Sequence, residues 1–321
     1  MIEAGRLAAD RREAGRRDWH DATDPRFAAA GLIALGLWLV SPVIPASMMA
    51  NVQDDDRAAA STSSTDDTSV RSRRNEYTFG GYGGTSYTQP STVYVDNPGA
   101  TDMTASDFGW IGRPFKSPIY YGLRTQRWNA DTITGTMIDF THAKAIAVVD
   151  DTAKFTGTYE GKPLPASAKL ETVFNRLEFS HGHNMLTLNG LVRSPASWLP
   201  VRPYFGLGGG ISLPHTEIQM EGRTRTFEYQ FAGYVGQALA GIEVPIGRTS
   251  LFFEYKFTYA PYSVPLTETR QGDLLVTDLW RQFRAWMSGE KPPGGRLTTT
   301  LSTHHAIGGL LIRSQTAPAV P

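Results

Sequence analysis

The chain has 321 residues, of which 40% are hydrophobic and 11% aromatic, and its formal net charge is zero. This length accommodates one large or two small domains. A balanced charge gives no electrostatic reason to expect a nucleic acid partner. The absence of Cys excludes disulfides, thiolate nucleophiles and thiolate metal ligands.

The N-terminal region has the order of a secretory signal. The basic segment "RLAADRREAGRR" precedes the uncharged apolar run "FAAAGLIALGLWLV" at 27–40, and "SPVIPASMMA" follows with helix breakers and small residues. Residues 1–50 are therefore predicted to be a signal peptide. An uncleaved membrane anchor is the alternative, although the apolar run is shorter than the ~20 residues of a full helical span. Residues 51–74 carry almost no large apolar side chain, so we predict a disordered linker there.

Period-2 alternation of apolar and polar residues begins at residue 75 and recurs along the rest of the chain. Such alternation, rich in Tyr, Phe, Leu, Thr and Gly, is typical of strands with two different faces. It predicts eight strands, at 76–88, 119–128, 132–147, 184–193, 201–213, 229–244, 250–260 and 298–312.

The joins between these strands alternate between long and short. The long joins are 89–118, 148–183, 214–228 and 261–297, and the short ones are "NAD", "SPASWLP" and "PIGRT". Extended loops on one rim and tight turns on the other are typical of membrane barrels. We therefore predict an all-β fold, an eight-stranded antiparallel up-and-down transmembrane β-barrel with long extracellular loops. The barrel would occupy 75–313, and 314–321 would be a flexible tail.

The two faces of the predicted strands agree with a membrane barrel. In 250–260, Leu251, Phe253 and Tyr255 share one face while Glu254 and Lys256 share the other. The interior of an eight-stranded barrel is narrow and filled by side chains. A soluble β-sandwich or a lipocalin-like barrel is the alternative, but such barrels face water on the outside. The polar face predicts ion pairs in the lumen from Arg124, Asp139, Arg202, Glu254 and Lys256.

Two neighbouring strands bring a polar cluster to the loop rim. "DFTHAKA" ends the third strand and "EFSHGHN" leads into the fourth, which places His142, Lys144, Glu178, His181, His183 and Asn184 near one another. On an extended chain His181 and His183 point the same way, so with Glu178 they are candidate ligands of a divalent metal ion. Histidine is also a general base near neutral pH, with His183 the first candidate. An inert set of rim histidines is the alternative.

Two of the long joins carry further candidate functions. In 89–118, Asp107, Trp110 and Lys116 are predicted to form a sugar-facing lip, and Lys144 is predicted to contact a lipid headgroup. An ordinary loop packed by Phe108 and Trp110 is the alternative. In 261–297, apolar residues recur at helical spacing, which predicts a short amphipathic helix on the headgroup layer or a helix that caps the barrel. Its apolar residues are Leu275, Leu279, Trp280, Phe283 and Trp286.

Dinucleotide chemistry is excluded by the motifs. "GLGGG" at 206–210 lies inside a predicted strand with no helix after it, and no P-loop or G-x-S-x-G elbow is present. A redox role would therefore use dioxygen or a metal ion, without flavin or nicotinamide.

At these motifs the chain resembles the lipid A oxidase family of rhizobia and related α-proteobacteria. The resembling stretches are "YTFGGYGGTSYTQPSTV", "SDFGWIGRPFKSPIYYGLRTQRW", "GTMIDFTHAKA", "HGHNMLTLNGLVR" and "RPYFGLGGGISLPHTE". They span most of 75–220, and the resemblance continues more weakly to about residue 312. "DFTHAK" and "GHN" match the family pattern, which draws attention to His142, His183 and Asn184.

The resemblance implies an outer-membrane enzyme. Such an enzyme would oxidise the proximal glucosamine of 1-dephosphorylated lipid A to 2-aminogluconate, with dioxygen as co-substrate and hydrogen peroxide as product. We accordingly expect a monomer in the bacterial outer membrane, with lipid A, lipopolysaccharide and membrane lipids as partners. Two alternatives stay open: a non-enzymatic structural or adhesin-like barrel, and a lipid A acyl-processing enzyme with a Ser180–His183 pair.

Overall fold

A computed structural model describes residues 75–130, 133–194 and 200–314. The predicted signal peptide, the predicted linker and residues 315–321 lie outside these described residues. The described part is all-β, as predicted, apart from the helix α3 (Leu275–Met287) and the single 3-10 turn η2 (Leu170–Thr172). α3 confirms the helix expected from the apolar spacing in the last long join. Within the described ranges, no helix has the length and apolar character that a membrane crossing requires.

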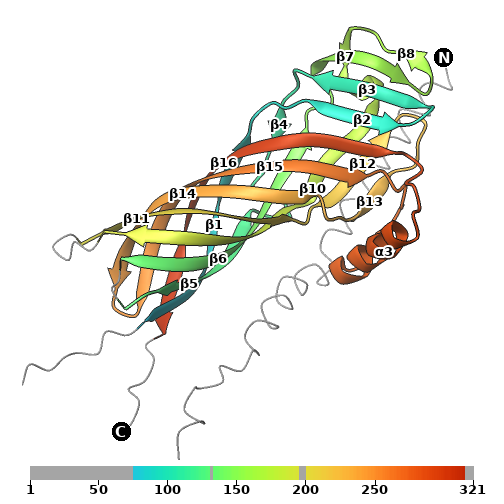
Figure 1. Cartoon of the computed structure of the whole chain (residues 1–321). Helices are drawn as coiled ribbons and strands as arrows, with labels where there is room; N and C mark the ends of the chain where they lie inside the picture. The colour runs from blue at the N-terminus through green and yellow to red at the C-terminus, as the bar shows by residue number, and fades with distance from the viewer. Residues whose placement is uncertain (1–74, 131–132, 195–199, 315–321) are drawn as a thin grey trace, which may run out of the picture. The chain divides into compact units, whose positions relative to one another are not determined.

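Eight antiparallel strands pair in a closed ring (Figure 1). Each strand pairs with the ring strand that follows it in the chain, and the last pairs with the first along most of their length. This order confirms the eight predicted strands and their neighbours. The ring strands are β1 (Glu76–Thr88), β5 (Tyr121–Trp128), β6 (Thr134–Ala147), β10 (Phe174–Arg193), β11 (Arg202–Ser212), β14 (Gly233–Ile246), β15 (Thr249–Pro265) and β16 (Arg296–Ser314).

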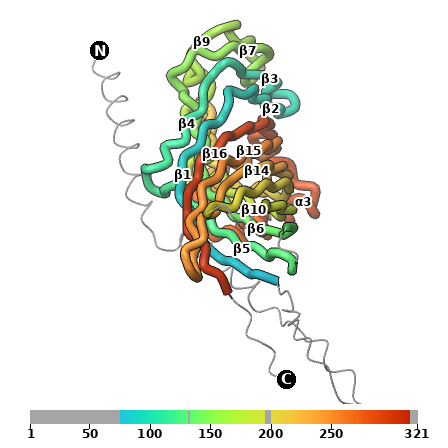
Figure 2. Tube along the Cα trace, turned by 90° about the vertical axis from the view of Figure 1, so that its left-hand side faces the viewer, coloured from blue at the N-terminus to red at the C-terminus, as the bar shows by residue number. Residues whose placement is uncertain are grey.

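The long joins contain strands of their own, which the sequence reading missed. They extend the sheet beyond one end of the ring, where Figure 2 shows β2, β3, β7 and β9 together. We call this region the cap; it also includes the ends of β6, β10, β15 and β16 that project past the ring. Its own strands are β2 (Val93–Asn97), β3 (Thr101–Ser106), β4 (Trp110–Ile111), β7 (Thr152–Tyr159), β8 (Lys162–Pro163), β9 (Ser167–Lys169), β12 (His215–Met220) and β13 (Thr226–Tyr229).

The interior of the ring is polar, and the charged groups at its centre are paired. The guanidinium of Arg124 donates to both carboxylate oxygens of Glu254, at 2.8 and 2.9 Å, and to Asp139 at 3.2 Å. Lys256 donates to the other oxygen of Asp139. These contacts confirm four of the five predicted interior charges. The fifth, Arg202, lies at the short-turn end of β11 and has no role in this central network.

One glycine makes room for this network. A Cβ at Gly122 would lie 1.9 Å from the ring of Tyr82, so only glycine fits there. The Tyr82 hydroxyl can then cross the interior and donate to Asp139 at 3.0 Å. Arg124 and Lys256 also lie over the Tyr82 ring, at 4.6 and 4.7 Å from its centroid. The ring is therefore filled by an ordered polar plug.

The cap has the opposite distribution. Its interior is one apolar cluster that includes Val93, Met103, Phe155, Phe179 and Leu297, all buried. β15 shows the change along a single strand: its inward residues pass from Glu254 and Lys256 in the ring to Ala260, Tyr262 and Val264 in the cap.

The outside of the ring is apolar. Large apolar side chains stand exposed on the outward positions of its strands, and Leu188 is 61% exposed. The others include Tyr77, Phe79, Leu186, Val192, Phe205, Leu207, Tyr234, Phe253, Tyr255, Tyr259, Leu310 and Ile312.

Candidate functional site on the outer wall

The predicted rim residues of β6 lie on the outward face of the sheet. Thr141 reaches the interior Lys256, and Ala143 and Ala145 belong to buried apolar clusters. Because side chains alternate along a strand, His142 and Lys144 point the other way. The site is therefore on the outer wall, at the level where the ring passes into the cap.

His142 and Asn184 are directly opposite each other on β6 and β10 and are hydrogen-bonded. The His142 Nδ1 and the Asn184 Oδ1 are 2.8 Å apart, and the Asn184 amide donates to the Leu213 carbonyl at 3.3 Å. This orientation assigns Oδ1 to the histidine, so Nδ1 carries the proton and Nε2 has the free lone pair. Tyr121 of β5 stacks on the imidazole at 4.7 Å and 18°.

The Nε2 atom of His142 is buried and has no hydrogen-bond partner within the described part of the chain. Buried polar atoms without partners are rare in native proteins. This one belongs to a histidine whose other nitrogen is already fixed. Nε2 of the inward-facing His183 also has no partner, so the free lone pair of His142 is distinguished by its place on the outward face.

A β-bulge separates His181 from His183. The register of β10 against β6 breaks between Phe179 and His183, and Gly182 has a φ of 145°. His183 points inward and hydrogen-bonds Tyr262 through Nδ1. The expectation that the two histidines point the same way is therefore wrong, because the bulge interrupts the simple alternation.

His181 instead joins residues of β12. Its Nδ1 lies 3.4 Å from Glu217 Oε2, and its ring lies 5.1 Å from that of His215. Ile218 and Met220 of β12 belong to the cap core, so the alternate residues His215 and Glu217 take the opposite, outward face. Arg176 and Arg225 bind the other oxygen of Glu217.

The buried groups of β12 have displaced pKa values. Burial would raise the pKa of Glu217, but the His181 hydrogen bond and the charges of Arg176 and Arg225 outweigh it and lower the pKa to about 2. Burial lowers the pKa of His215 to about 3, and the neighbouring His181 acts in the same direction. Glu217 is thus a carboxylate and His215 a neutral imidazole near pH 7.

The sequence reading missed His215, Glu217 and Tyr121. His215 and Glu217 are in "LPHTE", inside a stretch assigned to a loop, although their spacing of two is the signal of a shared strand face. Long-range pairing of β12 with β10 brings the first two beside His181.

The candidate metal ligands do not converge in this structure. His183 is directed into the interior, whereas Glu178 pairs with Glu217 in the register of β10 and β12 and shares its outward face. In residues 75–130, 133–194 and 200–314, no three His, Asp or Glu side chains are grouped as metal ligands. The divalent metal ion stays a prediction from the sequence.

The proposed sugar-facing lip is divided among different environments. Trp110 is only 4% exposed; it packs between Phe108 and Phe179 and donates to Ser91 at 3.0 Å. Its indole therefore has no face free for a sugar, and the packed-loop alternative describes it correctly. Asp107 is on the surface, paired with Lys154 at 2.7 Å.

The two lysines predicted to bind substrate do lie together. The Lys144 amine donates to the Lys116 backbone carbonyl at 2.7 Å. The loop that carries Lys116 therefore lies over β6, two residues from His142. Lys116 and Lys144 are the members of the predicted substrate set that the structure places beside the histidine site.

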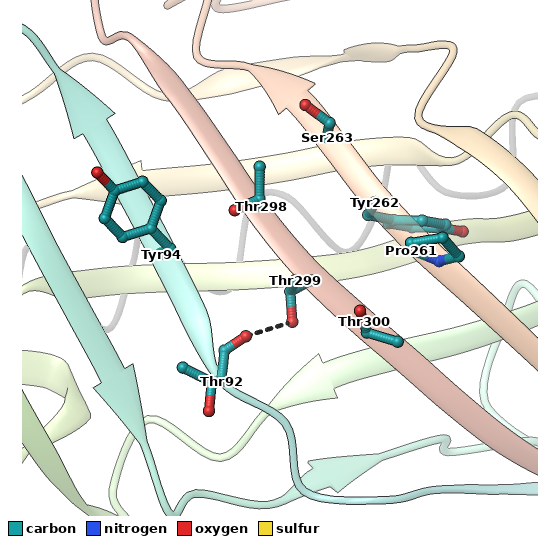
Figure 3. A pocket seen from close by; sticks show the side chains of 8 residues that line it. All are labelled: Thr92, Tyr94, Pro261, Tyr262, Ser263, Thr298, Thr299 and Thr300. Atoms are coloured by element: carbon teal, nitrogen blue, oxygen red, sulfur yellow. Dashed lines mark hydrogen bonds between the residues drawn. The ribbon is translucent and has the colours of Figure 1, made fainter.

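A separate groove lies on the outside of the cap, over β2, β15 and β16 (Figure 3). It has a volume of about 470 Å³ and is rich in hydroxyl groups, and Thr299 donates to the Thr92 carbonyl at 3.0 Å beside it. No His, Asp, Glu or Lys lines it, so it offers no general base near neutral pH. The lining residues are Thr92, Tyr94, Pro261, Tyr262, Ser263, Thr298, Thr299 and Thr300.

No protein-family model matches the chain, and no curated protein matches it. The geometry of the outer wall is therefore the basis of the functional argument.

Proposed function

We propose that this protein is an outer-membrane β-barrel whose outer-wall histidine site modifies lipid A. The membrane location is supported by the inverted distribution of residues in the ring: exposed Leu188, Phe205 and Phe253 outside, and ion pairs inside. Closure leaves the ring without a free sheet edge, as a spanning sheet requires in lipid. A water-soluble ring would place its apolar face inward.

The helix α3 also supports a membrane location, because one of its sides is docked and the other is apolar and exposed. Asp278 accepts the Tyr229 amide, and Gln282 bonds the Tyr229 carbonyl, so its polar side is docked on the edge of β13. The apolar side stands exposed, with Trp280, Phe283 and Trp286 in contact with one another. Exposed aromatic side chains on an amphipathic helix are typical of the membrane–water interface.

The observation that carries the proposal is the His142–Asn184 pair on the outward face. A site on the outer wall meets molecules that diffuse laterally in the leaflet, and its level coincides with the end of the apolar wall. The lipid that presents a sugar headgroup at that level of a bacterial outer membrane is lipid A. Asn184 holds the imidazole so that Nε2 acts as the general base.

The reaction we propose is the oxidation that the family resemblance implies. His142 Nε2 takes the proton of the anomeric hydroxyl of the proximal glucosamine, whose 1-phosphate has been removed. The anomeric carbon loses its hydrogen and two electrons to dioxygen, which with the two hydrogens becomes hydrogen peroxide. The resulting lactone adds water and opens to 2-aminogluconate, so the lipid gains one oxygen atom. His183, buried against Tyr262, is better suited to positioning than to this base role.

The acyl-processing alternative has one observation in its favour. Ser180 Oγ lies 3.4 Å from His181 Nδ1 and 3.3 Å from Glu217 Oε2, so a Ser, a His and a Glu do meet on the outer wall. However, serine and glutamate both approach Nδ1 of His181. A nucleophilic triad needs the serine on one ring nitrogen and the acid on the other. The contact also replaces the Ser180–His183 pair expected from the sequence.

Mass spectrometry of lipid A tests the proposal. The full chain is expressed in a Gram-negative host that carries a lipid A 1-phosphatase, and the lipid is extracted and weighed. We expect a gain of one oxygen atom with the wild type, and a loss of about 10²–10⁴-fold in rate with His142→Ala, the usual contribution of a general base. His304→Ala is the matched control, since His304 lies on the outward face of β16 and bonds only Gln89 and Tyr255 among the described residues.

Three results would contradict the oxidase. Full activity of the His142→Ala variant would show that His142 is not the general base. An acyl-sized mass change that depends on Ser180 indicates the acyl-processing enzyme. Unchanged lipid A in wild-type cells indicates a structural barrel.

A further inference from the structure

Residues 112–120 form a loop between β4 and β5 on the outer wall. It is held by its own backbone, with Tyr120 N donating to the Pro114 carbonyl at 2.8 Å and Lys116 N to the Arg113 carbonyl at 3.2 Å. The Lys144 amine donates to the Lys116 carbonyl and anchors the loop over β6. The loop is thus an ordered part of the wall beside His142.

The surface of this loop combines two large apolar side chains with two cations. Phe115 is 87% exposed and Ile119 is 57% exposed. Arg113 and Lys116 are exposed between and beside them. Exposed apolar tips next to basic residues are characteristic of surfaces that contact anionic lipid.

Lys144 adds a third cation below the loop. It is only 4% exposed, and within the described ranges no carboxylate lies at ion-pair distance from its amine. Lysines at that level of burial are normally paired with an acid. The charges of Arg113 and Lys116 both act on it, and that of Glu178 offsets them in part. Among these neighbours of Lys144 the basic residues outnumber the acidic one.

We propose that the loop 112–120, with Lys144, binds the phosphate of a phosphorylated lipid headgroup. Arg113 and Lys116 would contact the phosphate oxygens, the buried Lys144 would add its charge from below the loop, and Phe115 and Ile119 would enter the adjacent acyl layer. The proposal rests on the proposed function and deepens it, since it names a lipid phosphate other than the removed 1-phosphate as the group that orients substrate beside His142. Recognition of an intact lipid follows from the flanking apolar residues, which a free phosphate would leave unused.

Calorimetric titration of the purified full chain in zwitterionic detergent tests this. The probes are dihexanoyl phosphatidic acid, dihexanoyl phosphatidylcholine and inorganic phosphate. We expect phosphatidic acid to bind about tenfold more tightly than either of the others, because it alone offers both a phosphate monoester and acyl chains. The Arg113→Glu/Lys116→Glu double variant should lose about tenfold or more of that affinity.

Two variants locate the effect. Phe115→Ser should weaken phosphatidic acid and leave inorganic phosphate unchanged. Lys162→Glu, an exposed lysine of β8 in the cap, is the matched control and should leave both unchanged. Equal affinity for phosphatidic acid and phosphatidylcholine, an unchanged double variant, or equally tight inorganic phosphate would each overturn the proposal. The titration involves no oxidation, so its failure is separable from failure of the lipid A reaction.

Discussion

The ring and the cap are built from the same strands but place their residues in opposite ways. β15 carries Glu254 and Lys256 inside and Phe253 and Tyr255 outside while it is in the ring. Past Tyr259 it carries Tyr262 and Val264 inside and Ser263 outside. In the ring the apolar residues face away from the polar plug, and in the cap they face inward, away from the outside. The reversal on a continuous strand therefore agrees with the proposed membrane location, in which the surrounding medium changes at this level.

The histidine site lies at this reversal. On β10, Leu186 and Leu188 face outward on the ring side, and Ser180 and Glu178 face outward on the cap side. Asn184 and the Gly182 bulge come between them. In the proposed membrane location, a group at this position has an apolar phase below it and a polar one above, which suits the proposed chemistry on the headgroup of an amphiphile.

The largest expected effect comes from breaking the polar plug. Arg124→Met would leave Glu254 and Asp139 buried with less positive charge, at a cost of about 3–5 kcal/mol. Urea unfolding in lipid vesicles, followed by tryptophan fluorescence, measures it.

A double variant is the control for that measurement. Arg124→Met with Glu254→Gln removes both members of the two-bonded Arg124–Glu254 pair, keeps the Lys256–Asp139 pair, and should recover part of the loss. A single variant as stable as the wild type would mean that the plug contributes little.

Arginine substitutions at two positions of β10 test whether the walls of the ring and the cap face different media. Leu188→Arg places a charge on the apolar wall of the ring and should cost about 2–4 kcal/mol near the middle of a bilayer. Asn175→Arg, on the same strand in the cap and already exposed, should change the stability by less than about 0.5 kcal/mol. The same unfolding assay applies to both, and equal costs would argue that the two walls face the same medium.

The smallest expected effect is a loss of stability at acid pH that is confined to the cap. The folded pKa of His215 is about 3, below the ordinary 6.5, so the unfolded chain takes up the proton first as the pH falls. The contribution of His215 to the free energy of unfolding is complete above about pH 6.5 and diminishes toward pH 3. The expected loss of that free energy between pH 7 and pH 5 is about 2 kcal/mol. Hydrogen exchange, corrected for intrinsic rate, should show faster opening of β12 and β13 at pH 5.

The His215→Phe variant is the control for the pH measurement. It removes the titrating group, so most of the difference between pH 7 and pH 5 should disappear from β12 and β13. If the variant keeps the full difference, another group governs the acid sensitivity of the cap.

The ring could be predicted from sequence because its signals are local. Strict alternation and the alternating lengths of the joins identify the eight strands, and interior positions identify the charged partners Arg124, Asp139, Glu254 and Lys256. The cap could not, because its strands are short and pair with distant segments. β2 pairs with β16, about two hundred residues later in the chain.

The site was predicted only in part for similar reasons. His142 and Asn184 adjoin because β6 and β10 are neighbours, which the order of strands indicates. The separation of His181 from His183 depends on the Gly182 bulge, and a bulge leaves little trace in a pattern of alternation. The burial of Trp110 depends on contact with Phe179, on another strand.

The pairing of β1 with β16 has a consequence for biogenesis. Their register runs from Tyr77 opposite Ser314 to Thr88 opposite Thr303, so the earliest and latest segments of the ring meet along its full height. The ring therefore cannot close until β16, its last strand, has been synthesised. A product truncated before residue 303 would leave two strand edges of the ring unpaired, which the proposed membrane location does not tolerate, and we expect such a product to be degraded in the cell.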